Sequence, residues 1–116
     1  MFNSSSLRQI DVRELVQLIA EDSDSLQLID VREPEEVSIA KIPGFVVLPL
    51  SQFASWSSSI STRFNRDRAT IVLCHHGIRS AQMCQWLVSQ GFTNVGNVTG
   101  GIDAYAIMVD SSIPRY

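Results

Sequence analysis

A cysteine that ends an apolar run, with an arginine five positions later, is the feature of this 116-residue chain most suited to chemistry. The segment "CHHGIRS", residues 74–80, follows the largely β-branched run Thr70–Leu73 and precedes a helical pattern. Gly77 permits a tight turn, in which successive backbone N–H groups can form an anion-binding nest at the helix start. A sulfur in that field, with Arg79 nearby, is favoured as the thiolate. We therefore predict that Cys74 is a nucleophile in a pocket that also holds a small anion.

The two cysteines are expected to differ in role. A lone cysteine after a strand is usually a packing residue, but the strand end, glycine turn, arginine and helix start together favour reactivity for Cys74. Cys84 instead shares an apolar stripe with Ala81, Leu87 and Val88, which predicts a core position. A disulfide between the two cysteines is disfavoured, because so few cysteines without a secretory leader indicate a reducing compartment.

A metal site would have to use Cys74, His75, His76 and Cys84. Adjacent side chains on a tight loop cannot easily converge on one tetrahedral ion, and the usual two- to four-residue spacing between cysteines is missing. We therefore predict no metal. His75 and His76 are expected at the rim of the pocket, where their imidazoles could aid anion binding, tune the thiolate or simply be solvated.

Short apolar runs alternate with helical patterns along the chain. The expected strands are residues 26–29, 45–48, 71–73 and 95–98, and we expect 45–48 and 71–73 to be buried. The expected helices are one capped by Asp11, a short one starting at Pro34, one at 80–90 and one at about 102–109. A Ser-rich segment carries apolar residues at near-helical spacing that should face the core, namely Phe53, Trp56, Ile60 and Phe64.

This alternation predicts an α/β fold with a parallel sheet and helices on both faces. Sites in such sheets form beyond the carboxyl ends of the strands. Cys74 and Asp30 both stand at such ends. The length suits a single domain over residues 1–116, with its core at about 6–109.

Composition limits the classes of function. The net charge of −3 offers no electrostatic footprint for nucleic acid, and the basic segment Arg63–Arg68 is expected to be a solvated loop. The N-terminus shows no signal peptide. The longest apolar run, residues 42–50, contains two prolines and is too short to span a bilayer, so we expect no membrane partner. These features predict a cytoplasmic protein.

Three ordered motifs resemble those of the single-domain rhodaneses, a family of sulfurtransferases. They are "LIDVREPEEVSIAKIPGFVVLPL", "VLCHHGIRSAQMCQWLVSQGF" and "VTGGIDAYA", and the resemblance runs from about Ser6 to Tyr105. It implies a mainly parallel five-stranded sheet flanked by helices on both faces. It also implies that Cys74 forms a persulfide.

The resemblance implies a reaction as well. Cys74 would take the outer sulfur of a small anionic donor such as thiosulfate and pass it to cyanide or a thiol, including that of a protein partner, without a cofactor. The loop amides of His75, His76, Gly77, Ile78, Arg79 and Ser80 would cradle the sulfur and the donor. Arg79 would orient the loop or the donor. Asp30 and Arg32 would either support the pocket by pairing or contact the substrate directly.

The chain departs from the family pattern in places that leave the donor open. Lys41, Phe45 and Tyr105 stand where the family often has His, Ala and Trp. The loop matches neither the basic loop of thiosulfate-preferring members nor the small-residue loop of mercaptopyruvate-preferring ones.

Two other classes of function remain as alternatives. A phosphatase or arsenate reductase of the same fold would need a wider loop, with five residues between Cys and Arg, whereas this chain has four. The other alternative is a non-catalytic module, or a relay that accepts sulfur from a persulfidated protein. Many inactive rhodanese-like modules lack the cysteine, which this chain retains.

Overall fold

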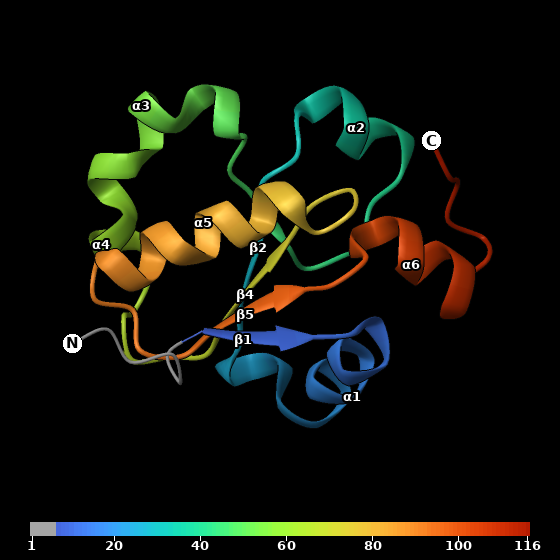
Figure 1. Cartoon of the computed structure of the whole chain (residues 1–116), viewed down its shortest axis with the longest axis horizontal. Helices are drawn as coiled ribbons and strands as arrows, with labels where there is room; N and C mark the ends of the chain where they lie inside the picture. The colour runs from blue at the N-terminus through green and yellow to red at the C-terminus, as the bar shows by residue number, and fades with distance from the viewer. Residues whose placement is uncertain (1–6) are drawn as a thin grey trace.

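The computed structural model describes residues 7–116, in which five strands form one sheet (Figure 1). Residues 1–6, which include the predicted start of the core at Ser6, lie outside this range. The strands are β1 (Leu7–Ile10), β2 (Gln27–Asp30), β3 (Val46–Val47), β4 (Thr70–Leu73) and β5 (Val95–Val98). Their order is β1-β5-β4-β2-β3, and all neighbouring pairs are parallel. The predicted fold class is confirmed.

The four longer helices begin at or within two residues of the predicted starts. They are α1 (Val12–Asp22), α2 (Pro34–Ile39), α5 (Ile78–Ser89) and α6 (Gly101–Met108). Asp11 caps α1, since its carboxylate accepts a hydrogen bond of 2.8 Å from the amide of Glu14. Helix α5 starts two residues before the predicted Ser80, because Gly77 adopts a left-handed conformation and becomes the N-cap. None of the helices in residues 7–116 has the length and apolar character that a membrane span requires.

The Ser-rich segment is less regular than one helix. It consists of η3 (Leu50–Gln52), α3 (Phe53–Trp56), η4 (Ser57–Ser59) and α4 (Ile60–Arg63). Hydroxyl groups bond to nearby carbonyls, as Ser59 Oγ does to Trp56 at 2.9 Å, and such bonds compete with helical ones. Trp56 and Ile60 are buried as predicted. Phe53 is 38% exposed, so the predicted core face is wrong at that residue.

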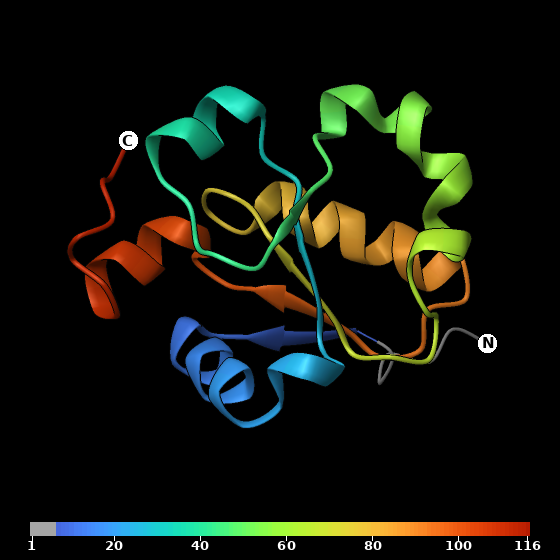
Figure 2. The ribbon, with the colours of Figure 1, turned by 180° about the vertical axis from the view of Figure 1, so that it is seen from behind.

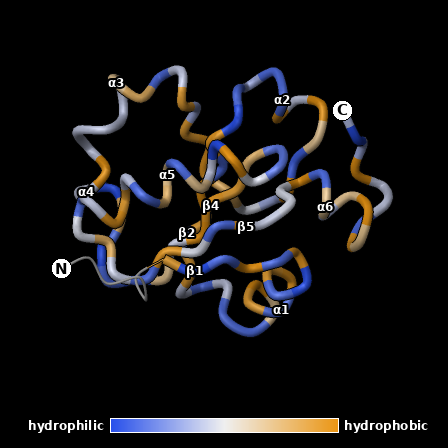
Figure 3. The backbone as a smooth tube through the Cα atoms, viewed as in Figure 1, coloured by the Kyte–Doolittle hydropathy of each residue, from blue (hydrophilic) through white to orange (hydrophobic). Residues whose placement is uncertain are grey.

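The sheet separates two hydrophobic clusters, and Figures 1 and 2 show the helices that cover its two faces. Helices α3, α4 and α5 cover one face and α1 and α6 cover the other. Strand β4 contributes Val72 to the first cluster and Ile71 and Leu73 to the second, which explains its continuous apolar run (Figure 3). Because β2, β4 and β5 are parallel, their carboxyl ends meet at one edge of the sheet, beside the starts of α2, α5 and α6.

The predicted burial of the run 45–48 is wrong for β3 itself. Val46 and Val47 are 38% and 36% exposed, and only Leu48 is fully buried. The reason is topological: β3 pairs with β2 on one side and forms the edge of the sheet on the other. Some apolar side chains of the run thus lie in the core and others lie at the surface.

Candidate active site

The predicted nucleophile lies directly after β4, in the loop that leads into α5. Cys74 is only 1% exposed, and its Sγ accepts hydrogen bonds from the amides of Gly77 at 3.0 Å and Ser80 at 3.3 Å. The hydroxyl of Ser80 lies 3.2 Å from the same sulfur. The loop thus folds around Cys74 and directs two amide dipoles at its sulfur, as the predicted anion-binding nest requires.

Asn97, on β5, fixes the orientation of Ser80. The Nδ2 group of Asn97 donates to Gln9 Oε1 at 2.8 Å and to the carbonyl of Gly77 at 3.2 Å. Its Oδ1 therefore faces Ser80 and accepts the hydroxyl hydrogen at 2.5 Å. Ser80 Oγ therefore presents its lone pairs, and not its hydrogen, to the sulfur of Cys74. Sequence reasoning missed Asn97, although a polar residue within a buried strand was the available signal.

The first turn of helix α6 supports the loop through backbone hydrogen bonds. The amide of Ile102 donates to the carbonyl of Cys74 at 2.9 Å, and the amide of Asp103 donates to that of His75 at 3.1 Å. This close approach requires Gly101, which has a φ of +60°. A Cβ there would lie 2.5 Å from the carbonyl oxygen of Cys74 and closer still to that of His75.

We expect Gly101→Ala to destabilise the protein by about 2–4 kcal/mol, because it adds backbone strain and a steric overlap at once. The loop would also be displaced, which should slow any reaction at Cys74. Thermal unfolding and the labelling rate of Cys74 would measure both effects. Gly96→Ala is the control, since its added Cβ would meet only side-chain carbons at 3.7 Å or more. Equal loss of stability in both variants would contradict this account of Gly101.

Arg79 joins the loop to α2 through a two-point ion pair. Its Nη1 and Nη2 donate to the two carboxylate oxygens of Glu36 at 2.7 and 2.8 Å. These bonds lower the pKa of Glu36 to about 2. Of the two roles predicted for Arg79, this geometry supports the one in which it orients the loop. Sequence reasoning missed Glu36, which had no feature to separate it from Glu35 beside it.

Asp30 and Arg32 form a second ion pair, after the end of β2. Both side chains are buried, with 2% of Asp30 and 0% of Arg32 exposed. Arg32 Nη2 donates to Asp30 Oδ2 at 2.7 Å, and Nε donates to Oδ1 at 3.0 Å. Its Nη1 reaches the hydroxyl of Tyr116 at 3.1 Å. Neither residue lines the pocket at Cys74. The structure therefore favours the supporting role over direct substrate contact.

The two histidines form a stack with a tyrosine from the segment after α6. The centroid of the His75 ring lies 3.9 Å from that of His76 and 3.9 Å from that of Tyr116. The planes of the His75 and Tyr116 rings are nearly parallel, at 6° to each other. Within residues 7–116, the buried Nε2 of His75 has no hydrogen-bond partner. Burial, and then the neighbouring His76, lower the pKa of His75, so the neutral imidazole is favoured. No sequence signal pointed to Tyr116.

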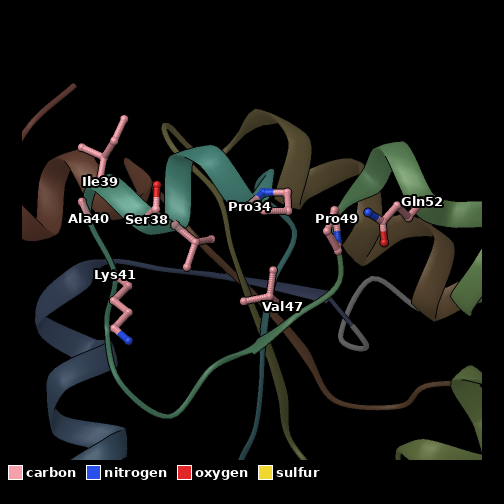
Figure 4. A pocket seen from close by; sticks show the side chains of 9 residues that line it. Pro34, Ser38, Ile39, Ala40, Lys41, Val47, Pro49 and Gln52 are labelled. Atoms are coloured by element: carbon pink, nitrogen blue, oxygen red, sulfur yellow. The ribbon is translucent and has the colours of Figure 1, made fainter.

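The sulfur faces a small pocket of about 260 Å³, lined by Cys74, His75, His76, Ile78 and Arg79. Ile78 is 72% exposed and places an apolar side chain at its rim. A larger groove of about 750 Å³ lies between α2 and β3, where Figure 4 shows Lys41 and Val47. The larger groove is the weaker candidate for an active site despite its size, because it lacks the cysteine and its two amide donors.

Cys84 occupies the core position that the sequence predicted. Its side chain is 0% exposed in the cluster beneath α5. Burial raises the pKa of its thiol to about 12, so the thiolate is scarce at neutral pH. Both cysteines are free thiols.

Comparison with known proteins gives one consistent family. A family model described as a rhodanese-like domain matches residues 11–108. The chain is 49% identical over 112 residues to rhodanese-like/PpiC domain-containing protein 12, chloroplastic, of Arabidopsis thaliana. That match covers 95% of this chain but 38% of the relative, so the chain spans well under half of that protein's length.

Two further matches cover most of both chains. A protein of Allochromatium vinosum named sulfurtransferase is 36% identical over 100 residues, which are 86% of this chain and 89% of that one. The crystal structure of a rhodanese-like domain protein from Staphylococcus aureus superposes with a TM-score of 0.74 at 26% identity. The superposition covers 94% of this chain and 98% of the Staphylococcus aureus chain.

Proposed function

The chain belongs to the rhodanese-like domain family, and from that premise we propose that it is a sulfurtransferase that carries a sulfane sulfur on Cys74. The observation that best supports this is the pair of amides, from Gly77 and Ser80, that donate to the sulfur of Cys74 at the base of a small pocket. A thiolate placed among fixed donors is stabilised without losing access to a small reagent.

The first step is attack of the Cys74 thiolate on the outer sulfur of the donor. With thiosulfate, a new S–S bond forms on Cys74, the S–S bond of the donor breaks, and sulfite leaves with the electron pair of that bond. The loop amides that face Cys74 Sγ would hold the negative charge that remains on the Cys74 persulfide.

The second step returns the enzyme to its starting state. A nucleophilic acceptor, either cyanide or a thiolate, attacks the outer sulfur of the persulfide. The Cys74 thiolate leaves, and the product is thiocyanate or a new persulfide. Because donor and acceptor react in turn at one sulfur, the kinetics should be ping-pong.

Intact-mass measurement after incubation with thiosulfate tests this proposal. We expect the mass of one added sulfur atom, located on Cys74 by peptide fragmentation and removed by cyanide as thiocyanate. If thiosulfate gives no adduct, the same measurement with a persulfidated protein donor tests the relay form of the function. Failure with several classes of sulfur donor would overturn the proposal and favour a non-catalytic module.

A further inference from the structure

Every guanidinium that surrounds the cysteine loop is already paired with a carboxylate within residues 7–116. Arg79 binds Glu36, Arg32 binds Asp30, and Arg115 binds Asp103. Three positive and three negative groups leave no net formal charge around the loop. The pairing at Arg79 matters most, since this residue lines the pocket. Both of its terminal nitrogens donate to Glu36, so an oxyanion of the donor would meet a guanidinium whose positive charge is already balanced by a carboxylate.

Glu36 is held in place by more than Arg79. Its Oε2 accepts from the amide of Glu33 at 2.9 Å, and its Oε1 accepts from the hydroxyl of Tyr116 at 2.9 Å. That hydroxyl in turn accepts from Arg32 at 3.1 Å. With its pKa lowered to about 2, Glu36 remains anionic at any physiological pH. Its negative charge therefore stands permanently beside Arg79, which lines the pocket.

The other residues of the pocket add little positive charge. Burial lowers the pKa of His75, which favours its neutral form. His76 lies with Nδ1 3.9 Å from a carboxylate oxygen of Asp103. Ile78 presents an exposed apolar side chain. A donor would therefore meet backbone amides, a hydrophobic rim and a neutralised arginine.

We propose that Glu36 is a specificity-determining residue that selects sulfur donors with at most one negative charge, such as organic persulfides and thiosulfonates, over dianionic thiosulfate. This inference rests on the proposed function. A dianion must lose its hydration on entering the pocket, and the paired arginine offers it little in return. A monoanionic organic donor loses less hydration and gains contact with Ile78.

Two donors that differ mainly in charge test this directly. Methanethiosulfonate has the same transferable sulfur as thiosulfate but carries a methyl group in place of one anionic oxygen. Its transfer to Cys74 forms the same persulfide and releases methanesulfinate instead of sulfite. The measurement is the ratio of kcat/KM for thiosulfate to kcat/KM for methanethiosulfonate, with cyanide as the acceptor.

We expect Glu36→Gln to raise this ratio about threefold to tenfold, because a dianion gains twice as much as a monoanion when one nearby negative charge is removed. Glu35→Gln is the matched control, since it removes the same charge from an exposed position in the same turn of α2. An unchanged ratio in Glu36→Gln, or an equal rise in Glu35→Gln, would overturn the inference.

A second variant keeps the test valid if Glu36→Gln fails to fold. Tyr116→Phe retains the ring on His75 and the charge of Glu36 but removes a hydroxyl that donates to this carboxylate, so its charge is less screened and the ratio should fall by a small factor. No shift in a folded Tyr116→Phe protein would then count against the inference. Failure of both donors to load Cys74 in the unaltered protein would instead overturn the proposed function.

Discussion

Cys74→Ser should abolish sulfur transfer while leaving the fold intact. A serine hydroxyl is a far weaker nucleophile at neutral pH than a thiolate, and its oxygen cannot form a persulfide. The fold should survive because the amides of Gly77 and Ser80 can donate to the new hydroxyl as they do to the sulfur. We expect thiocyanate production to fall at least about a thousandfold, with no added sulfur in the intact mass and little change in Tm.

The control for this variant is Cys84→Ala, which removes the only other thiol of the chain. Cys84 is fully buried and its raised thiol pKa leaves little thiolate, so it should not replace Cys74 as a sulfur carrier. We expect a loss of roughly 1–2 kcal/mol in the free energy of unfolding, with most of the activity retained. Equal loss of activity in the two variants would contradict the assignment of the nucleophile.

The geometry of the loop could be predicted because its signals are local. Cys74, Gly77 and Ser80 lie within seven residues, and a strand end, a turn and a helix start fix their relative positions. The ends of β2 and β4 could also be placed together, since parallel strands align their carboxyl ends. For that reason Asp30 was predicted at the correct edge of the sheet, beside the loop of Cys74.

The contacts that complete the site join residues far apart in the sequence. Glu36 and Arg79 are 43 residues apart, and Arg32 and Tyr116 are 84 apart. Glutamate and tyrosine are ordinary surface residues, so nothing in their type announces these partners. Only the packing of α2 and of the segment after α6 against the loop brings them together.

Two errors about strands have the same physical origin. Strand β1 was not predicted, because "LRQI" has too few apolar residues to indicate a strand and forms one by pairing with β5. The run 45–48 was predicted to be buried, because an apolar run does not show whether its strand lies at the centre or the edge of a sheet. Whether a segment forms a strand and whether that strand is buried both depend on neighbours that are distant in the sequence.

Arg32→Ala should cause the largest loss of stability among single changes near the site. The substitution leaves the carboxylate of Asp30 buried, with the amide of residue 32 as its remaining donor. An uncompensated buried charge of this kind costs about 3–5 kcal/mol, which corresponds to a fall in Tm on the order of 15 °C. Thermal unfolding followed by circular dichroism would measure it. Arg115→Ala is the control, because that arginine also pairs with an aspartate but is 61% exposed, and its Tm should hardly change.

A double variant separates the two roles that the sequence left open for this pair. If the cost of Arg32→Ala comes from the stranded charge, Asp30→Ala in the same protein should recover part of the lost stability, since no buried ion then remains unpaired. Sulfur transfer should recover with it, because neither side chain lines the pocket of Cys74. A double variant that regains stability but stays inactive would instead show that the pair contacts the donor. A Tm for Arg32→Ala as high as that of Arg115→Ala would contradict the supporting role altogether.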